Sequence, residues 1–382
     1  MIIKRDLGPI LQKYLKKYAI ILLTGPRQSG KTTLVQSLFP DFLYTNLESL
    51  DVRLMAQEDP RGFLAQGKQM VIDEVQKVPE LLSYLQTLID ANKHLKFILT
   101  GSQNLLLLSK IKQSLAGRVA LFRLFPFDLN ELEQAGWRKK KLLEQMLWGF
   151  YPPIYSQKLK PYKWYLDYIA TYLERDVREL VNIRNMRDFS RFLKLTAGRT
   201  GQILNLSSLA VEVGVSVNTI KQWLSILEAS YIIFFLRPYY RNFNKRIIKS
   251  PKLYFYDTGI VTALLGIKNV AELTNHPLKG SIFETFIIAE IKKWFTHHDR
   301  NISLYFWQEQ NRREIDLLYE DGGKIHAYEI KSTHTFSPKL FSNIEYFESL
   351  SRKKIVGQVI FAGDKELKFK HYAFVPWNRI FN

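Results

Sequence analysis

The stretch that decides the fold of the N-terminal part is Ala19-Ile-Ile-Leu-Leu-Thr24 followed by Gly25-Pro-Arg-Gln-Ser-Gly30-Lys31-Thr32-Thr33. The first six residues form an apolar run typical of a buried strand, and a helical pattern covers Leu34 to Phe39. A GxxxxGK[ST] sequence between a strand and a helix is the signature of a phosphate-binding loop. The sequence therefore predicts an α/β domain that binds a nucleotide.

Each position of this loop has a physical task. Glycines let backbone N–H groups turn toward phosphate oxygens, and the N-terminus of the following helix adds partial positive charge. We expect Lys31 to reach the β- and γ-phosphates of ATP and Thr32 to ligate Mg²⁺ through its hydroxyl group. The predicted nucleotide-binding residues are Gly25, Pro26, Arg27, Gln28, Ser29, Gly30, Lys31, Thr32 and Thr33.

A second strand ends in two carboxylates, in the sequence Met70-Val-Ile-Asp73-Glu74. Ligands of α/β sheets bind at the carboxyl ends of the strands. We expect Asp73 to hold the Mg²⁺ ion and Glu74 to orient and polarise the attacking water.

A third strand, Lys96 to Thr100, also ends in small polar residues. Thr100, Ser102 and Asn104 are equivalent candidates for sensing the γ-phosphate, and a plain hydrogen-bonded turn is an alternative for all three. Arg118 is a candidate arginine finger that acts in a neighbouring subunit, because a guanidinium group offsets transition-state charge. A surface ion pair is the alternative for Arg118.

These motifs resemble a group of bacterial and archaeal AAA-type ATPases. The resemblance is carried by the loop, by Ile72-Asp-Glu-Val-Gln-Lys-Val-Pro79, by Leu99-Thr-Gly-Ser102 and by Ser114-Leu-Ala-Gly-Arg118. It continues in the phrases Tyr172-Leu-Glu-Arg-Asp176 and Lys252-Leu-Tyr-Phe-Tyr-Asp257-Thr-Gly259 and so covers nearly the whole chain. It implies an AAA-like ATPase core and a C-terminal half of incompletely characterised function.

Composition narrows the class of protein further. The chain has 382 residues, no cysteine and a formal net charge of +19. The lack of cysteine excludes disulfides, thiolate metal sites and a cysteine nucleophile, and it suits the cytoplasm. The apolar runs are far shorter than a membrane span, and no signal peptide is expected at the N-terminus. The basic surplus favours a polyanion partner, with nucleic acid ahead of a membrane surface and DNA as the expected form.

The chain divides into three predicted domains. Residues 1–135 alternate apolar runs with helical patterns, as an AAA-like α/β ATPase domain does. Residues 136–250 begin with a basic run and are mostly helical, and residues 251–382 return to mixed α and β. We expect a helical and winged-helix middle domain followed by a C-terminal α/β domain. By analogy with other AAA-type ATPases we expect a homo-oligomer.

A helix–turn–helix is predicted from Leu206 to Leu224. Ser207 is expected to cap one helix, Gly214 to form the turn and Ser216 to cap the second helix. Helical spacing puts Val217, Ile220, Leu224 and Leu227 on a buried stripe and leaves Asn218, Thr219, Lys221 and Gln222 on the other side.

A basic hairpin follows the helix–turn–helix. The strand-like run Tyr231 to Leu236 leads into a segment without Asp or Glu up to Tyr256, which predicts the wing of a winged helix along a phosphate backbone. Its basic residues are Arg241, Lys245, Arg246, Lys249 and Lys252. We expect contacts to the phosphate backbone of DNA rather than sequence-specific contacts to its bases. The alternative is that the winged helix binds another protein.

The C-terminal part carries a set of carboxylates on elements that should pack together. Glu284 lies on an amphipathic helix, Asp316 shares a strand face with Glu314, and Glu329 shares a strand face with Lys331. Carboxylates beside an amine suit a hard divalent cation and a charge stabiliser.

This order of helix Glu, strand Asp and Glu-x-Lys resembles the PD-(D/E)XK nuclease fold, which is restriction-endonuclease-like. The resemblance implies that Asp316 and Glu329 ligate Mg²⁺ or Mn²⁺, that Glu284 completes or supports the metal site and that Lys331 positions or activates water. The sequence thus predicts an ATP-hydrolysing, DNA-binding protein with a metal-dependent nuclease-like site. The alternative is an ATP-switched DNA-binding or signalling protein whose nuclease fold is silent.

Overall fold

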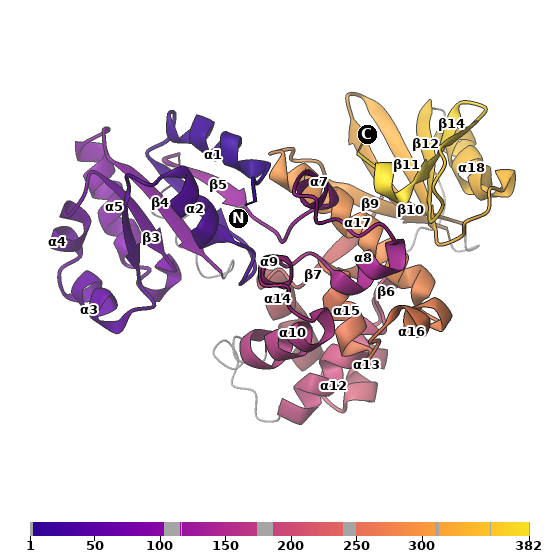
Figure 1. Cartoon of the computed structure of the whole chain (residues 1–382), viewed down its shortest axis with the longest axis horizontal. Coiled ribbons are helices and arrows are strands. Elements are labelled where there is room, and N and C mark those ends of the chain that lie inside the picture. The colour runs from indigo at the N-terminus through magenta and orange to yellow at the C-terminus, as the bar shows by residue number, and fades with distance from the viewer. Residues whose placement is uncertain are drawn as a thin grey trace.

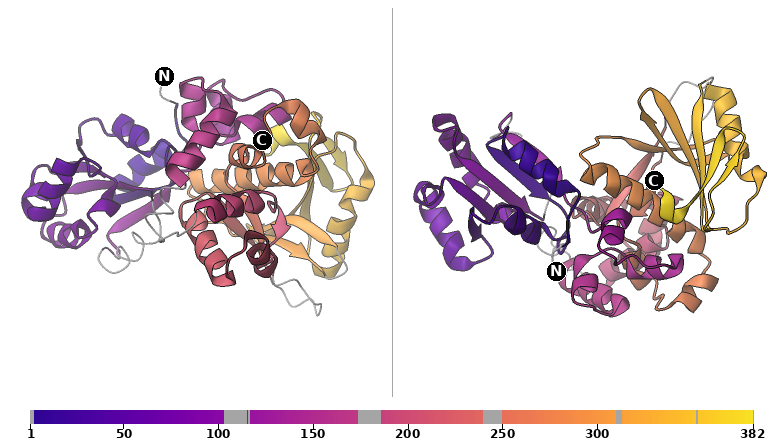
Figure 2. Two further views of the ribbon diagram at one scale, coloured as in Figure 1. Left: turned by 90° about the horizontal axis from the view of Figure 1, so that it is seen from below. Right: turned by 45° about the horizontal axis from the view of Figure 1, so that its top comes forward.

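The computed structural model describes residues 3–102, 115, 117–173, 186–239, 250–309, 313–351 and 353–381. These residues form two sheets with helices around and between them (Figure 1). The first sheet belongs to the indigo and purple N-terminal part, and most of the second belongs to the orange and yellow C-terminal part (Figure 2). None of the helices in these ranges is both long and apolar enough to cross a bilayer.

The first sheet has the strand order β2-β3-β4-β1-β5, and all neighbouring strands run parallel. Its strands are β1 (Ile20–Thr24), β2 (Leu43–Asn46), β3 (Gln69–Asp73), β4 (Lys96–Gly101) and β5 (Val119–Arg123). The helices around it are α1 (Leu7–Leu15), α2 (Lys31–Leu38), α3 (Leu50–Glu58), α4 (Pro60–Ala65) and α5 (Leu81–Ala91), with a 3-10 turn η1 (Val75–Lys77).

Alternating side chains along β1 build two separate cores. Ile20 and Leu22 belong to the apolar cluster that includes residues of α4 and α5, whereas Ile21 and Leu23 belong to the cluster with α1 and α2. Helices therefore cover both faces, which is the arrangement that a parallel sheet requires. The carboxyl ends of all five strands meet at one edge, and the phosphate loop starts there.

The middle of the chain is mainly helical, as predicted. It contains α7 (Leu129–Gln134), α8 (Leu142–Trp148), α9 (Pro152–Ser156), α10 (Pro161–Tyr168), the π-helical turn η2 (Ile169–Leu173), α12 (Met186–Ala197), β6 (Gln202–Ile203), α13 (Leu206–Val213) and α14 (Val217–Ala229).

The turn between α13 and α14 is built largely as the sequence suggests. Gly214 has φ 85°, a left-handed conformation that favours glycine. Ser216 caps α14 by accepting a hydrogen bond from the amide of Thr219 at 3.1 Å. The predicted cap of α13 is wrong, because the side chain of Asn205 accepts from the amide of Ser208, and Ser207 lies inside the helix. Asn is as good an N-cap as Ser, so composition alone does not choose between neighbours.

The second sheet has the order β13-β14-β12-β11-β10-β9-β7-β8-β6. Its other strands are β7 (Ile233–Pro238), β8 (Lys252–Phe255), β9 (Leu304–Gln308), β10 (Glu314–Asp321), β11 (Lys324–Lys331), β12 (Ile355–Phe361), β13 (Leu367–Phe369) and β14 (Tyr372–Pro376). The accompanying helices are α15 (Thr258–Leu264), α16 (Val270–Asn275), α17 (Lys279–His297) and α18 (Ser342–Ser351), with 3-10 turns η3 (Pro338–Phe341) and η4 (Trp377–Arg379).

This sheet runs across the domain boundary predicted at residue 250. Strand β7 pairs in parallel with β9, where Arg237 lies opposite Tyr305, and pairs antiparallel with β8. The hairpin that follows the helix–turn–helix is therefore continuous with the C-terminal sheet. The three-domain division stays a prediction, and the strand pairing shows that the second and third parts share backbone hydrogen bonds.

Candidate nucleotide site and carboxylate cluster

The loop between β1 and α2 turns at two glycines. Gly25 has φ 151°, and a Cβ atom there would lie 2.1 Å from the carbonyl oxygen of Leu124, so the loop requires glycine at this position. Gly30 has φ 93° and directly precedes α2. The first N–H groups of a helix have no partner within it, so they are available to an anion.

Lys31 is buried, and its ammonium group curls back over the loop. It donates to the carbonyl oxygens of Gly25 at 3.0 Å and Pro26 at 2.9 Å. The charge is thus held at the centre of the loop.

Asp73 is the meeting point of three hydroxyl groups. Its Oδ2 accepts from Thr32 Oγ1 at 2.7 Å and from the hydroxyl of Tyr44 at 2.8 Å, and its Oδ1 accepts from Thr100. Burial and the bond to Asp73 raise the pKa of Tyr44 well above its ordinary value, so this hydroxyl stays a donor. Thr32 and Asp73 offer the hard oxygen atoms that Mg²⁺ prefers, and the donor set fits that ion.

Glu74 is the first residue after β3, and its backbone is left-handed, with φ 57° and ψ 45°. A non-glycine residue in this conformation is uncommon and costs free energy. Its carboxylate accepts from Gln76 Nε2 and from Ser102 Oγ, the latter at 3.2 Å. Thr100 therefore supports Asp73 and Ser102 supports Glu74, while Asn104 lies outside the described residues.

Of these groups, Lys31, Thr32 and Glu74 line a cavity of about 360 Å³. Its far wall comes from α9 and the residue after it, which no sequence motif identified. The lining residues are Arg27, Gln28, Gly30, Lys31, Thr32, Thr33, Glu48, Glu74, Pro152, Pro153, Ser156 and Gln157. The middle of the chain thus closes the nucleotide site, and the hydroxyl of Tyr168 also donates to the carbonyl oxygen of Arg27 at 3.4 Å.

A smaller, apolar hollow adjoins this cavity and shares Gly30, Thr33, Pro152 and Ser156 with it. Its other lining residues are Ile3, Arg5, Leu34, Phe127 and Trp137. A polar chamber next to an apolar one suits a ligand with a charged end and a flat apolar end.

Arg118 lies away from this cavity. It directly precedes β5, so it stands at the amino end of a parallel sheet whose carboxyl end carries the phosphate loop. Its guanidinium group binds Asp90 through Nε at 2.7 Å and through a second nitrogen at 2.9 Å. Arg118 therefore forms the ion pair named as its alternative, and it cannot reach the nucleotide of its own chain.

Helix α14 buries the predicted apolar stripe and exposes a polar one. Ile220, Leu224 and Leu227 are buried, Val217 is half-buried, and Trp223 joins them. Asn218, Lys221 and Gln222 are exposed, whereas Thr219 is half-buried beside Ser216.

The prediction that Lys252 contacts a phosphate backbone is wrong. Lys252 is 4% exposed and binds carboxylates inside the protein. It lies on β8 beyond the hairpin tip, so strand pairing turned it inward. The other basic residues predicted for the wing, Arg241, Lys245, Arg246 and Lys249, lie outside the described residues.

The predicted C-terminal carboxylates converge on two lysines. Lys252 binds Glu284 at 3.1 Å and also binds Glu314. Lys331 binds Asp316 at 2.9 Å and Glu329 at 2.7 Å. We call these six residues the carboxylate cluster.

Further donors hold the carboxylate cluster in place. The hydroxyl of Tyr254 donates to Glu284 at 2.6 Å, the amide of Ile330 donates to Asp316 at 2.7 Å, and Asn343 Nδ2 donates to Glu329 at 3.0 Å. Lys252, Tyr254 and Asn343 belong to this site, although their sequence pattern did not predict it. Lys252 and Tyr254 alternate with apolar residues on one strand, and that spacing was the available signal.

Burial shifts the pKa values of the acids in the cluster. It raises the pKa of Glu284 to about 7, against the opposing effect of Lys252, and it raises the pKa of Glu329 to about 8. Burial acts in the same direction on Asp316, but Lys331 and Lys252 outweigh it and hold the pKa of Asp316 below its ordinary value. Carboxylate oxygens of Glu284, Glu314 and Asp316 lie within 4.8 Å of one another, which is close enough to share a cation.

Comparison with known proteins agrees with the nucleotide site. An AAA domain family model matches residues 17–133, and two domains of unknown function, DUF8612 and DUF4143, match residues 139–271 and 279–380. The uncharacterized protein Rv2008c of Mycobacterium tuberculosis is 30% identical over 344 residues, which cover 88% of this chain and 75% of that protein. The uncharacterized protein Mb2031c of Mycobacterium bovis matches equally.

Two solved structures share a weaker similarity. The Walker-type ATPase PABY2304 of Pyrococcus abyssi has a TM-score of 0.46 and 16% identity, over 68% of this chain and 94% of that one. The signal transduction ATPase PH0952 of Pyrococcus horikoshii has a TM-score of 0.24 and 15% identity, over 76% of this chain and 48% of that one. By sequence, the chain belongs to the family of the two mycobacterial proteins, and its residues 17–133 are an AAA-type P-loop ATPase domain.

Proposed function

We propose that the protein binds ATP with Mg²⁺ between β1 and α2 and hydrolyses it. The observation that carries this proposal is the 2.7 Å bond between Thr32 and Asp73 at the rim of a cavity that also holds Lys31. A helix N-terminus, an ammonium group and paired hard oxygen donors in one cavity match the charge distribution of a metal-bound triphosphate.

The residues of the site divide the work of phosphoryl transfer. Lys31 offsets charge on the β- and γ-phosphates, and Thr32 and Asp73 hold the metal, which neutralises charge that develops on the phosphate oxygens. Glu74, held by Gln76 and Ser102, accepts a hydrogen bond from the attacking water and orients it. The apolar hollow beside Leu34, Phe127 and Trp137 receives the purine base.

Lys31→Ala tests this proposal, with Lys16→Ala, at the exposed residue directly after α1, as the matched control. We expect the first variant to lose MgATP binding or turnover and the second to behave as the parent protein. Steady-state hydrolysis and titration calorimetry give the two readouts. Unchanged hydrolysis by the Lys31 variant would contradict the assignment.

We further propose that the exposed stripe of α14 binds nucleic acid, with DNA as the expected form. The support is the set of exposed side chains Asn218, Lys221 and Gln222 on a capped second helix, together with the net charge of +19. ATPase assays with duplex, branched and single-stranded DNA test it. Hydrolysis and binding that are indifferent to all three would favour a signalling protein whose basic regions bind other proteins.

We propose a homo-oligomer in which Arg118 acts on the nucleotide of a neighbouring subunit. Its place at the amino edge of the sheet, away from the cavity of its own chain, is compatible with this role, and the ion pair with Asp90 is the alternative. Mixing two inactive variants tests this proposal. A Lys31→Ala chain still supplies Arg118 to its neighbour, and an Arg118→Gln chain still has an intact phosphate loop. We expect each variant alone to be impaired and a mixture of the two to regain activity. A mixture no more active than its parts would refute action between subunits.

The carboxylate cluster supports a second proposal, a metal-dependent nuclease centre. It holds four carboxyl groups beside two ammonium groups, and a divalent cation bound there would favour the ionised forms of Glu284 and Glu329. Asp316 and Glu329 would ligate Mg²⁺ or Mn²⁺, Lys331 would position water, and Glu284 would support the site from beside Lys252.

The double change Glu329→Ala with Lys331→Ala tests the nuclease centre. We expect cleavage of DNA or RNA in Mg²⁺ or Mn²⁺ to disappear while ATP hydrolysis persists. If the parent protein cuts neither nucleic acid in either metal, the silent alternative holds, and the protein is an ATP-switched binder.

A further inference from the structure

We propose that Arg5 is a positioning residue for the phosphate loop and that the C-terminal helix α17 holds the groups that orient Arg5. The inference rests on the proposed ATPase function. Arg5 lies before residues 17–133, which the AAA domain model matches. Its side chain is 5% exposed, so its charge is almost wholly removed from water.

The guanidinium group of Arg5 ties three segments together. It donates to the carbonyl oxygen of Ser29 at 2.9 Å, to the carbonyl oxygen of Phe125 at 2.7 Å and to Glu131 Oε1 at 2.9 Å. Ser29 belongs to the phosphate loop, and Phe125 and Glu131 belong to the segment that leaves the ATPase sheet. A planar fork of donors can hold such an arrangement, whereas a single ammonium group cannot.

The bond to Ser29 has a direct consequence for the nucleotide cavity. In a trans peptide unit the C=O and the following N–H point in opposite directions. Arg5 draws the carbonyl of Ser29 toward itself, and this directs the N–H of Gly30 the other way. Gly30 lines the cavity, and Nη1 of Arg5 lies 3.7 Å from where a Cβ atom of Gly30 would be. Arg5 therefore orients a loop donor at the phosphate end of the cavity, and it also lines the adjoining apolar hollow.

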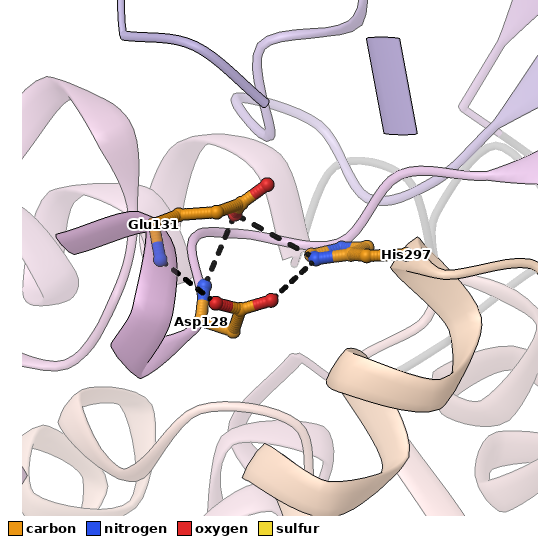
Figure 3. A group of neighbouring side chains, drawn as sticks. All are labelled: Asp128, Glu131 and His297. Atoms are coloured by element: carbon orange, nitrogen blue, oxygen red, sulfur yellow. Dashed lines mark hydrogen bonds and ion pairs between the residues drawn. The ribbon is translucent and has the colours of Figure 1, made fainter. Parts of the chain in front are cut away.

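Glu131 is itself held by a buried network that reaches α17 (Figure 3). Asp128 and Glu131 form a capping box at the start of α7. His297, near the end of α17, lies 3.0 Å from Asp128 through Nδ1, and its Nε2 accepts from the amide of Phe125 at 3.2 Å. An accepting Nε2 places the proton on Nδ1, so His297 donates to Asp128. All three side chains are fully buried.

Two more side chains of α17, on the same helix face as His297, form hydrogen bonds to the backbone after β5. Glu290 accepts from the amide of Leu129 at 2.7 Å, and Lys293 donates to the carbonyl oxygen of Phe127 at 2.6 Å. Helical spacing puts residues 290, 293 and 297 on one face. Side chains of α17 therefore hold the segment after β5 in place. Arg5 bonds both to this segment and to Ser29 of the phosphate loop, so the position of the loop depends on the position of the segment.

Asp128, Glu131 and His297 also have the spacing of a metal site. Their ligand atoms are already engaged, however, by Arg5, by the capping box, by the amide of Phe125 and by one another. The network therefore suits a positioning role.

Steady-state ATP hydrolysis by full-length variants tests the proposal. The informative changes are Arg5→Gln, Arg5→Lys, Glu131→Gln and His297→Gln. The matched controls are Arg138→Gln and Glu133→Gln. Glu133 lies on α7, the helix that also carries Glu131, and Arg138 lies just after that helix. The two residues form an ion pair at 2.7 Å, and Glu133 is exposed.

We expect Arg5→Gln to lower kcat by about 10- to 100-fold with a smaller change in KM, because a misdirected loop donor costs most when charge develops on the phosphates. Arg5→Lys should recover part of this loss, Glu131→Gln and His297→Gln should lower kcat to a lesser extent, and both controls should match the parent protein. Thermal unfolding of each variant shows whether it is folded. If Arg5→Gln does not fold, Glu131→Gln decides.

The outcomes separate this proposal from the ATPase assignment. Folded Arg5 and Glu131 variants with the kcat of the controls would overturn the positioning role while the ATPase assignment stands. If the parent protein binds MgADP but does not hydrolyse ATP, calorimetry with MgADP takes over, and equal affinities of parent and Arg5→Gln would overturn the positioning role. A parent protein that binds no nucleotide would overturn both.

Discussion

The hydroxyl group of Tyr231 donates a 2.9 Å hydrogen bond to Oγ1 of Thr24, the last residue of β1 before the phosphate loop. Tyr231 follows the end of α14 and has φ 59°, an unfavourable conformation for an aromatic residue. The bond therefore links the end of the predicted recognition helix to the start of the nucleotide site. It is a second contact between the phosphate-loop region and the rest of the chain, and it does not involve Arg5.

Tyr231→Phe removes only this hydroxyl group. We expect the free energy of unfolding to fall by about 1 kcal/mol, the typical worth of one buried hydrogen bond. If nucleic acid stimulates hydrolysis, the ratio of stimulated to basal rate should also fall. Urea denaturation and ATPase assays with and without DNA measure the two effects, and Tyr84→Phe, on the exposed side of α5, is the control. An unchanged unfolding free energy would show that the hydroxyl contributes nothing.

Glu74→Gln should separate binding from chemistry. The amide keeps the size of the side chain but is a poor acceptor for a proton of water, so we expect kcat to fall by about 10²- to 10⁴-fold. MgATP affinity should change little. Single-turnover hydrolysis and calorimetry measure the two quantities. Glu58→Gln, at an exposed carboxyl group on α3 away from the cavity, is the control. Equal rates for the two variants would remove Glu74 from the mechanism.

Glu290 should make stability depend on pH. Burial raises the pKa of Glu290 to about 8, although Lys293 opposes the shift. Between the ordinary carboxyl pKa of 4.5 and about 8 the folded state binds more protons than the unfolded state. The free energy of unfolding should therefore fall as pH rises through this window, by at most about 1.4 kcal/mol per pH unit from this group.

Glu290→Gln tests that expectation, because the amide does not titrate. The slope of unfolding free energy between pH 5 and pH 8 should become flatter in this variant, as measured by denaturant titration at each pH. Glu133→Gln, at an exposed carboxyl group, should leave the slope unchanged. Parallel slopes for Glu290→Gln and the parent protein would mean that Glu290 is ionised in the folded state across the range.

Lys221→Ala should weaken DNA binding in a salt-dependent way. Each phosphate contact that is lost lowers the slope of log affinity against log salt concentration by about one. Fluorescence anisotropy at several salt concentrations measures this slope. Lys163→Ala, on the exposed surface of α10, is the control. A slope that is identical in both variants would exclude Lys221 as a phosphate contact.

Local sequence determined which strands and helices surround the two candidate sites, although it did not fix every helix end. An apolar run, two glycines and a Gly-Lys-Thr sequence predict the strand, loop and helix around Lys31, because the signals lie within a few residues of one another. The same holds for Asp73 at the end of β3 and for the strand pair that carries Asp316 and Glu329. Alternation along a strand is a local property, so the faces that these side chains share were readable in advance.

The partners of these residues were decided only by tertiary structure. Arg5 meets Glu131 across 126 positions of sequence, and Tyr231 meets Thr24 across 207. Lys252 looked like one more basic residue of a wing, and strand pairing placed it between two half-buried carboxylates. Such contacts depend on how whole elements pack against one another. Local pattern therefore named the residues of the candidate phosphate site, and packing decided which distant side chains contact them.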